Sequence, residues 1–428
     1  MISTNNIQTW WPRIQTVISW IPVVGLLMLI AVLPFHYNWC QRIAWYWLAI
    51  TYPLDYVVNC RWQNWHWTNS KWTFVAFIAF ALLVPLWQLF DPLHTDLYET
   101  TLENVAPFFF LGFVGILGVT DKMHLDYVAW TMLTVSLGII AYLIYIVGVA
   151  MPSLHSWIFS FNEHRMLDVN SHMVINLYWN MTLVAGLWVV LRSGRSLTTK
   201  ILTAVMMLPI VLALLISEGR TGIITLLMAT LIVLLYLLIT HRNRWLLLPL
   251  ALYVIAAFVY VGNNKRMEDA RTQKNPRVYL WQIARETIAE QPVVGYGVCS
   301  ARKEFVSRVR ENEYLSAMYV RPEIEENPLC HRDGDVLYEM IHPHNAVLET
   351  WMRFGVIGLL LFFACLILPM TMHLDGYQLY MDLCVLAFSL QAVFESLGNN
   401  LQPLFLCLMT LLIYSSYHAE QTHTSLPN

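Results

Sequence analysis

Runs of about 20 apolar residues recur along this chain, and they constrain its fold more than any other feature. A helix needs roughly 20 apolar residues to cross the hydrocarbon core of a bilayer, which is about 30 Å thick. Of the 428 residues, 57% are hydrophobic and only 12% are charged, whereas soluble domains usually carry about a quarter charged residues. The runs lack the apolar–polar alternation of a membrane β-barrel. The sequence therefore predicts an all-α polytopic membrane protein.

Twelve membrane spans are predicted from these runs. They lie near residues 17–35, 41–58, 72–90, 104–120, 126–149, 173–191, 199–217, 221–240, 245–262, 346–369, 377–395 and 400–417. The first run is expected to be a span and not a cleaved signal peptide, because Arg13 precedes a long apolar stretch without a polar gap. The 18 Trp and 21 Tyr fit aromatic belts at the membrane interfaces.

One long polar stretch, 263–345, interrupts the spans and holds 12 of the 25 Lys and Arg residues. It divides the chain into 1–262, the stretch itself, and 346–428. Apolar residues recur at helical spacing after Pro276 and again from Ala301 to Tyr314, so two amphipathic helices are predicted within it.

The predicted orientation follows from the short connections between spans. With the N-terminus inside, about nine Lys and Arg lie in inner connections and about three in outer ones, in keeping with the positive-inside rule. The long polar stretch then lies outside, as one large loop. The net charge of -3 gives no indication of a nucleic-acid partner.

A polar break, Ser217-Glu218-Gly219-Arg220-Thr221-Gly222, separates two predicted spans. An arginine near the bilayer is costly, about 2.5–3.5 kcal/mol at its centre and less at its edge. Two readings are open for Arg220: it pairs with Glu218 or reaches the lipid headgroups, or it forms an outward-facing anion site. Arg277, at the start of the first predicted loop helix, offers a second guanidinium on the same side, and such planar forks match phosphate oxygens.

The loop ends in His342-Pro343-His344-Asn345. Three readings are open for the two histidines: metal binding, proton acceptance by an imidazole whose ordinary pKa is about 6.5, or interfacial hydrogen bonding alone. No carboxylate or thiol stands at local metal-ligand spacing. Glu349 and Arg353 are one helical turn apart and are expected to pair with each other.

The loop also contains Cys299 and Cys330. In an oxidising periplasm these two residues are expected either to form a disulfide or to remain free thiols. Cys365, Cys384 and Cys407 fall within spans and are expected to be buried thiols.

Taken in order, these motifs resemble those of the bacterial O-antigen ligase and polymerase superfamily. An Arg-Thr-Gly lies between two spans, and the loop that follows opens with Arg-x-x-x-Trp-x-x-Ala and a Pro-x-x-Gly-x-Gly turn. It closes with His-x-His-Asn-x-x-Leu-Glu ahead of Gly-x-x-Gly-Leu-Leu. The resemblance runs from about Ser217 to Phe363.

The resemblance implies a metal-independent, inverting glycosyltransferase without a cofactor, in the bacterial inner membrane. Such an enzyme moves a glycan from an undecaprenyl-pyrophosphate carrier to a lipid A-core sugar at the periplasmic face. By this resemblance Arg220 and Arg277 hold the pyrophosphate, and His344, beside His342, acts as the base or orients the acceptor. Further substrate contacts are expected from Thr221, Trp281 and Asn345.

Three alternatives remain from the sequence. A polysaccharide polymerase of the same superfamily would use the same residues on a different acceptor. A lipid-linked glycan transporter needs polar residues through the membrane, for which Asp382 and Glu395 are the main candidates. The third is a scaffold without catalysis, in which Arg220, Arg277 and His344 need not lie together.

Overall fold

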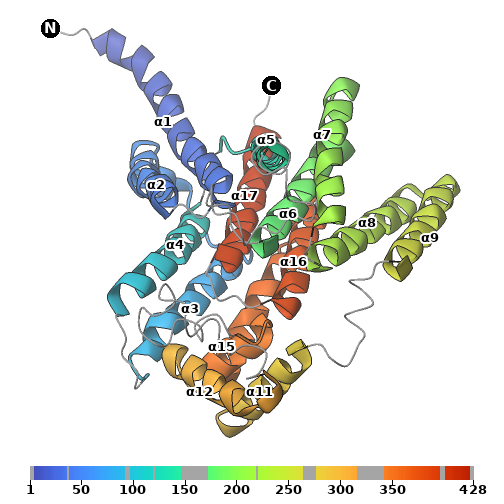
Figure 1. Cartoon of the computed structure of the whole chain (residues 1–428). Helices are drawn as coiled ribbons and strands as arrows, with labels where there is room; N and C mark the ends of the chain where they lie inside the picture. Colours follow the sequence, from blue (N-terminus) through green and yellow to red (C-terminus); the bar gives the residue numbers. More distant parts are fainter. Residues whose placement is uncertain are drawn as a thin grey trace.

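The computed structural model describes residues 4–35, 38–91, 97–118, 121–145, 172–217, 220–263, 276–315, 342–395 and 401–424. These ranges contain helices and no strand (Figure 1). The long helices are α1 (Thr4–Val32), α2 (Asn38–Val58), α3 (Lys71–Gln88), α4 (Leu97–Leu117), α5 (Leu125–Tyr145), α6 (His172–Leu191), α7 (Leu197–Ile216), α8 (Arg220–His241), α9 (Leu247–Asn263), α15 (Ala346–Met370), α16 (Gln378–Phe394) and α17 (Leu401–Thr424). Each of the predicted spans coincides with one of these helices.

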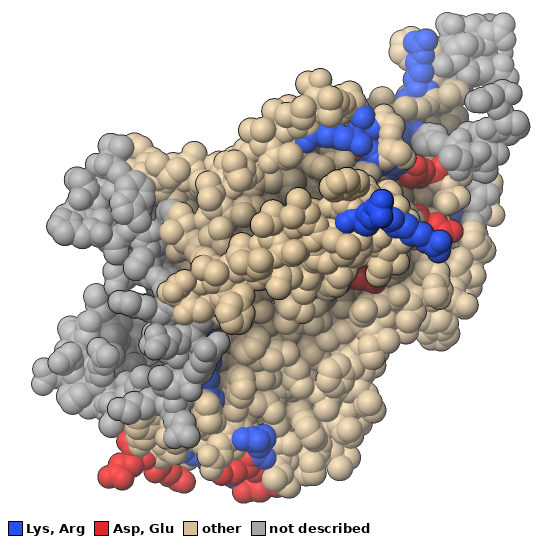
Figure 2. All heavy atoms as spheres, turned by 90° about the vertical axis from the view of Figure 1, so that its right-hand side faces the viewer, with Lys and Arg blue, Asp and Glu red and all other residues tan. Residues whose placement is uncertain are grey.

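Eight helices in the described ranges are long and apolar enough to cross a membrane: α1, α3, α5, α6, α7, α8, the segment Arg244–Asn263 that contains α9, and α15. An all-α polytopic membrane protein is therefore confirmed, while the count of twelve spans stays a prediction. Figure 2 shows charged side chains gathered toward the two ends of one face, with a broad, largely uncharged surface between them. Such a surface suits contact with lipid tails, which cannot solvate charge.

Helix α6 lies at the centre of the bundle. It packs against α5, α7, α8 and α16, and 83% of the residues in its apolar segment are buried. Trp179 and Tyr178 are fully buried there, and the ring of Tyr178 meets Phe405 of α17 edge-on at 5.7 Å. By contrast, none of the apolar segment that contains α9 is buried, so this helix lies at the rim.

Two further helices, α11 (Pro276–Glu290) and α12 (Val298–Glu311), confirm the two amphipathic helices predicted in the loop. They lie together at one end of the bundle (Figure 1), called here the α11 end. Their apolar faces share a small core, separate from that of the bundle, in which Ile283 and Phe305 pack near Met352 of α15. This core ties the loop helices to a membrane helix.

The loop helices are also held by hydrogen bonds to a break in α15. Gly355 leaves the helical conformation, with φ 63° and ψ −159°, and the break frees backbone groups on both sides. The N–H groups of Tyr296 and Gly297 donate to the carbonyls of Met352 and Arg353 at 2.9 and 3.0 Å. The turn between α11 and α12, residues 291–297, is thereby docked into the kink.

Both sides of this docked turn make further contacts. The indole Nε1 of Trp87 donates to the carbonyl of Val294 at 2.6 Å, and the indole Nε1 of Trp351 on α15 donates to the carbonyl of Pro292 at 2.9 Å. Buried Asp91, just past α3, accepts the N–H groups of Cys299 and Ser300 at 2.7 and 3.1 Å. A carboxylate at a helix N-terminus satisfies N–H groups that have no partner within the helix and favours the helix dipole.

Cys365, Cys384 and Cys407, predicted to be buried because they fall within spans, are buried in the structure. Cys330 lies outside the described residues, so a disulfide with Cys299 and two free thiols both stay as alternatives.

Replacement of Gly355 by alanine is expected to undock the turn. A residue other than glycine at this positive φ costs about 1–3 kcal/mol, and the added Cβ would lie 2.0 Å from the carbonyl oxygen of Val293. We expect Gly355→Ala to lower the thermal unfolding midpoint of the purified protein and to expose residues 291–297 to protease. The matched control is Gly138→Ala in α5, where an added Cβ meets nothing within 4 Å. Equal midpoints for the two variants would contradict the docking.

Candidate functional site

Three segments that are distant in sequence meet at the α11 end. The Nη2 of Arg277, in the first turn of α11, lies 3.1 Å from Oε1 of Glu395, and its Nη1 donates to the carbonyl of Phe394 at 2.9 Å. The other carboxylate oxygen of Glu395 lies 3.4 Å from Nδ1 of His344. We call these three residues, Arg277, Glu395 and His344, the Arg–Glu–His cluster.

Burial within the cluster is uneven. The side chain of Glu395 is 5% exposed, while those of Arg277 and His344 are 34% and 27% exposed. A buried carboxylate is costly unless it is paired and hydrogen-bonded, and both of its oxygens have partners here. The carboxylate therefore lies beneath the surface and fixes two side chains that reach it.

The sequence reasoning considered Glu395 only as part of a transport path. It lies instead just past the end of α16 and faces the catalytic candidates. One feature of the sequence could have indicated this position. Glu395 is a lone carboxylate at the end of a predicted span, on the same predicted side of the membrane as the His-x-His motif. What the sequence could not supply was the fold that brings it to Arg277, 118 residues earlier.

The two histidines of the motif have different environments. Their ring centroids are 5.5 Å apart. Burial lowers the pKa of His342 to about 4, although the nearby carboxylate of Glu349 opposes this shift. His342 is therefore neutral at neutral pH. His344 has a positive φ of 49°, an uncommon conformation for this residue that is held by the surrounding structure.

Glu349 and Arg353 pair with each other on α15, as predicted. Glu349 is 3% exposed, so the pair is buried beside His342. Among the described residues, Oε2 of Glu349 and Nε of Arg353 are buried without a hydrogen-bond partner, and so is Nε1 of Trp281 on α11. Such atoms are rare in folded proteins.

Asn345 forms the N-cap of α15. Its Oδ1 accepts the N–H of Leu348 at 2.9 Å, the usual way in which asparagine begins a helix. This bond fixes the start of α15 directly after the two histidines. The predicted substrate contact of Asn345 stays a prediction, and the capping role was missed in the sequence reasoning although an Asn before an apolar helix is a known signal.

Arg220 begins α8 and is half-buried. Among the described residues it has no ion pair, and Glu218, its predicted partner in one reading, lies outside them. The start of α8 is held by polar contacts to α6: Ser217 Oγ donates to Asn176 at 2.9 Å, and Asn180 Nδ2 donates to the carbonyl of Gly222 at 3.2 Å. Thr221 is 4% exposed and belongs to this packed junction.

Helix directions place Arg220 at the α11 end. The end of α6 meets the start of α16 through Arg192 and Tyr377, at the end opposite to the Arg–Glu–His cluster. From there α7 runs back along α6, so that α8 begins where α16 finishes, and α8 packs against α16. The structure thus joins Arg277 and His344 through Glu395 and brings Arg220 to the same end, with no described contact between Arg220 and the cluster.

Between the end of α7 and α9 the surface is hollowed and mostly apolar. An open hollow of about 670 Å³ is lined by Leu215 near the end of α7 and by Ala256, Val259, Tyr260 and Asn263 of α9. The Tyr260 hydroxyl donates to the carbonyl of Leu215 at 2.8 Å and joins the two helices.

In the described ranges, no group of three or more His, Cys, Asp or Glu residues is arranged to hold a metal ion.

Comparison with known proteins gives a family match over residues 202–363, to the model described as O-antigen ligase. The matched segment contains Arg220, Arg277, His342 and His344, and ends before Glu395. Three curated relatives carry the name "Putative polysaccharide ligase". The protein from Rickettsia conorii is 27% identical over 92 residues, 21% of this chain and 18% of the relative. The protein from Rickettsia typhi is 24% identical over 104 residues, 24% of this chain and 21% of the relative.

The aligned segments thus span about a fifth of the length of these relatives. The protein from Rickettsia prowazekii is similar to the same extent, 25% identical over 103 residues. Together, the family model and these relatives confirm the resemblance drawn from the motifs and support placing this chain in the O-antigen ligase superfamily.

Proposed function

We propose that this chain is an inverting, metal-independent glycosyltransferase that moves a glycan from an undecaprenyl-pyrophosphate carrier to a lipid A-core sugar. The observation that carries the proposal is the Arg–Glu–His cluster, two members of which lie in the segment that matches the O-antigen ligase model. The positive-inside bias of the short connections favours the periplasmic side for this end of the bundle.

In this mechanism the guanidinium groups bind the pyrophosphate. An acceptor hydroxyl attacks the anomeric carbon, the bond from that carbon to the pyrophosphate oxygen breaks, and negative charge grows on the leaving group. Arg277 is held by Glu395 and by the carbonyl of Phe394, so its position is fixed before the substrate arrives. Preorganised charge of this kind stabilises a transition state without reorganisation. Arg220, at the same end, supplies the second cation.

His344 is the proposed base. Its Nδ1 faces Glu395, and a carboxylate at that nitrogen favours the tautomer with the proton on Nδ1. The Nε2 lone pair is then available to accept the proton of the attacking hydroxyl, and the carboxylate stabilises the imidazolium that forms, as in a Ser-His-Asp arrangement. Neutral His342, whose ring lies 5.5 Å from that of His344, is the proposed hydrogen-bonding partner for a sugar hydroxyl.

The apolar hollow between α7 and α9 suits the carrier's isoprenoid chain. It begins five residues before Arg220, at Leu215. An isoprenoid that lies there keeps its tail at the lipid-facing rim while its pyrophosphate reaches the start of α8. The hollow therefore supports a lipid-linked donor over a soluble nucleotide sugar.

The direct test is to incubate the purified protein in detergent with undecaprenyl-pyrophosphate glycan and one of two acceptors. Transfer to lipid A-core supports the ligase, and transfer to a second carrier-linked glycan identifies a polymerase. Because detergent removes any transmembrane gradient, product formation also excludes transport as the main activity. If neither product forms from a folded protein, the proposal fails.

Replacement of the buried carboxylate by its neutral amide should slow transfer by the protein that folds. Glu395→Gln keeps the side-chain shape but removes the charge that holds Arg277 and His344, and we expect the turnover rate to fall by roughly 10²–10³-fold. The matched control is Glu286→Gln on the exposed face of α11, where the carboxylate contacts only Gln282 among described residues. Unchanged turnover in Glu395→Gln would remove Glu395 from the mechanism.

Arg277→Ala and His344→Ala are expected to abolish transfer, because each removes a group in contact with the donor or the acceptor proton. Arg285→Ala is the control for Arg277, since Arg285 lies on the exposed face of the same helix and donates only to a backbone carbonyl at 3.4 Å. Full activity in His344→Ala would leave the proposed base without a role.

The low pKa of His342 predicts a pH-dependent contribution to stability. The unfolded chain takes up this proton near pH 6.5 and the folded protein only near pH 4. Between these values the unfolded state binds more protons, so this contribution is lost as the pH falls. We expect the unfolding midpoint of wild type to fall more steeply than that of His342→Gln from about pH 6.5 to 4. If the unfolding midpoints of wild type and His342→Gln changed in parallel with pH, His342 would not be buried as a neutral imidazole.

A further inference from the structure

A second polar site lies at the end of the bundle opposite to α11. A cavity of about 410 Å³ is enclosed by α1, the connection from α2 to α3, the end of α4 and α17. Lys71 at the start of α3 lines it, while Asp91, just past the other end of α3, contacts α12. At 1.5 Å per residue, the 18 residues of α3 separate the two places by roughly 27 Å. The cavity is therefore distinct from the proposed active site.

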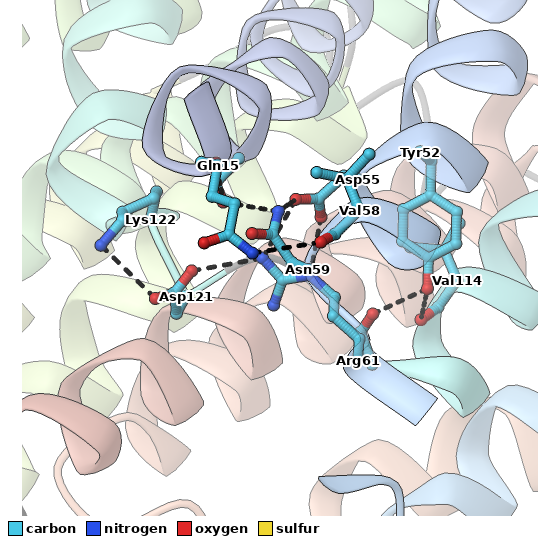
Figure 3. A network of polar contacts seen from close by, with 11 residues as sticks. Gln15, Tyr52, Asp55, Val58, Asn59, Arg61, Val114, Asp121 and Lys122 are labelled. Atoms are coloured by element: carbon cyan, nitrogen blue, oxygen red, sulfur yellow. Dashed lines mark hydrogen bonds and ion pairs between the residues drawn. The ribbon is translucent and has the colours of Figure 1, made fainter. Parts of the chain in front are cut away.

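Most charges around this cavity are already paired (Figure 3). Arg61 bridges Asp55 through Nε at 2.7 Å and Asp121 through Nη2 at 3.3 Å. Lys122 adds a second cation to Asp121 at 3.4 Å, and Asn59 donates to Asp55 at 2.7 Å. Asp121, which lines the cavity, and the fully buried Asp55 are thus compensated by their own partners.

Lys71 is the exception. It is 5% exposed, its ammonium donates to the carbonyl of His66 at 2.5 Å, and it lies 4.7 Å from the centre of the Trp65 ring. No carboxylate in the described part of the chain lies within ion-pair distance of it. A buried ammonium has three donors, and a buried cation without an anion is costly. The cavity in front of it can supply that anion from outside.

The remaining lining suits a phosphate group. Hydroxyls of Thr68 and Tyr414 and the imidazoles of His66 and His418 share the wall with Arg61 and Lys71. The volume of about 410 Å³ is within the usual range for a small-molecule pocket, about 300–1,000 Å³. A cationic wall with hydroxyl donors matches the many acceptor oxygens of a phosphate.

The depth of the cavity in the membrane points to the source of that phosphate. Three tryptophans of the same connection and one in the first turn of α3 are exposed: Trp62 by 47%, Trp65 by 42%, Trp67 by 44% and Trp72 by 53%. Exposed tryptophans gather at the level of the lipid headgroups, where an apolar ring with a polar N–H is favoured. The mouth of the cavity therefore lies where phospholipid phosphates are abundant.

We propose that this cavity binds the phosphate of an anionic phospholipid headgroup, with Lys71 as the cation that holds it. The bound lipid joins α3, α4 and α17 at the end of the molecule away from the active site. The proposal does not depend on the glycosyltransferase assignment, because it concerns other residues and is tested by binding.

The test measures binding of phosphatidylglycerol to the full-length protein by native mass spectrometry. Diacylglycerol with the same acyl chains isolates the contribution of the phosphate. We expect phosphatidylglycerol to bind and diacylglycerol not to bind, and Lys71→Gln to weaken binding by roughly ten- to a hundredfold, as the loss of one charge-assisted contact predicts. Lys200→Gln, which removes a cation at the same end of the bundle but outside the cavity, should bind as wild type does.

A second pair of variants covers the case in which Lys71→Gln fails to fold. Thr422 lies exposed at the edge of the cavity, so Thr422→Glu adds a repelling carboxylate and Thr422→Gln is its neutral counterpart. We expect weaker binding only in the glutamate variant. If inorganic phosphate displaces the lipid, the site binds both free phosphate and the phosphate of a lipid headgroup. If it does not, the site binds only the lipid headgroup. Equal binding by diacylglycerol, or unchanged binding in both Lys71→Gln and Thr422→Glu, would overturn the proposal.

Discussion

The docking of the 291–297 turn into the kink of α15 is the constraint on which the site depends. A helix ordinarily satisfies its own backbone groups, and this one is interrupted at Gly355 so that the carbonyls of Met352 and Arg353 accept N–H groups from the loop. The bonds fix α11 and α12 against a membrane helix. Arg277 at the start of α11 then comes within reach of Glu395, and the first turn of α15 places His344 on the other side of the same carboxylate.

Buried carboxylates organise this end of the molecule. Glu395 and Glu349 are both nearly inaccessible, and each is matched by a guanidinium that is more exposed than its partner. The acids therefore lie beneath the surface and the cations reach outward. Removal of one partner of such a buried pair is expected to be far more harmful than loss of a surface ion pair, because it leaves an uncompensated charge. The arrangement directs positive charge outward while keeping each arginine fixed.

The sequence predicted the parts of this structure that depend on local patterns. Apolar runs located the helices to within a few residues in most cases, helical spacing located α11 and α12, and the i, i+4 spacing of Glu349 and Arg353 predicted their ion pair. The partnership of Glu395 with Arg277 and His344 was not predictable in this way. It spans 118 and 51 residues, and no local period connects segments that far apart.

The kink at Gly355 illustrates the same limit. The sequence shows a glycine in an apolar helix, which alone is compatible with an uninterrupted span. Its positive φ follows from the partner segment, since an added Cβ would collide with Val293, 62 residues earlier in the chain. The conformation of α15 and the position of the loop are therefore determined together by their contact.

Hydrogen exchange of the backbone amides of Tyr296 and Gly297 tests this account most directly. Both N–H groups are hydrogen-bonded to α15 although they belong to a turn at the surface of the bundle. Docking predicts that they exchange as slowly as the interior amides of α11, because exchange requires the turn to leave the kink. Exchange at the rate of an unprotected turn would show that the loop is not fixed to the membrane helix, and that the Arg–Glu–His cluster is not preformed.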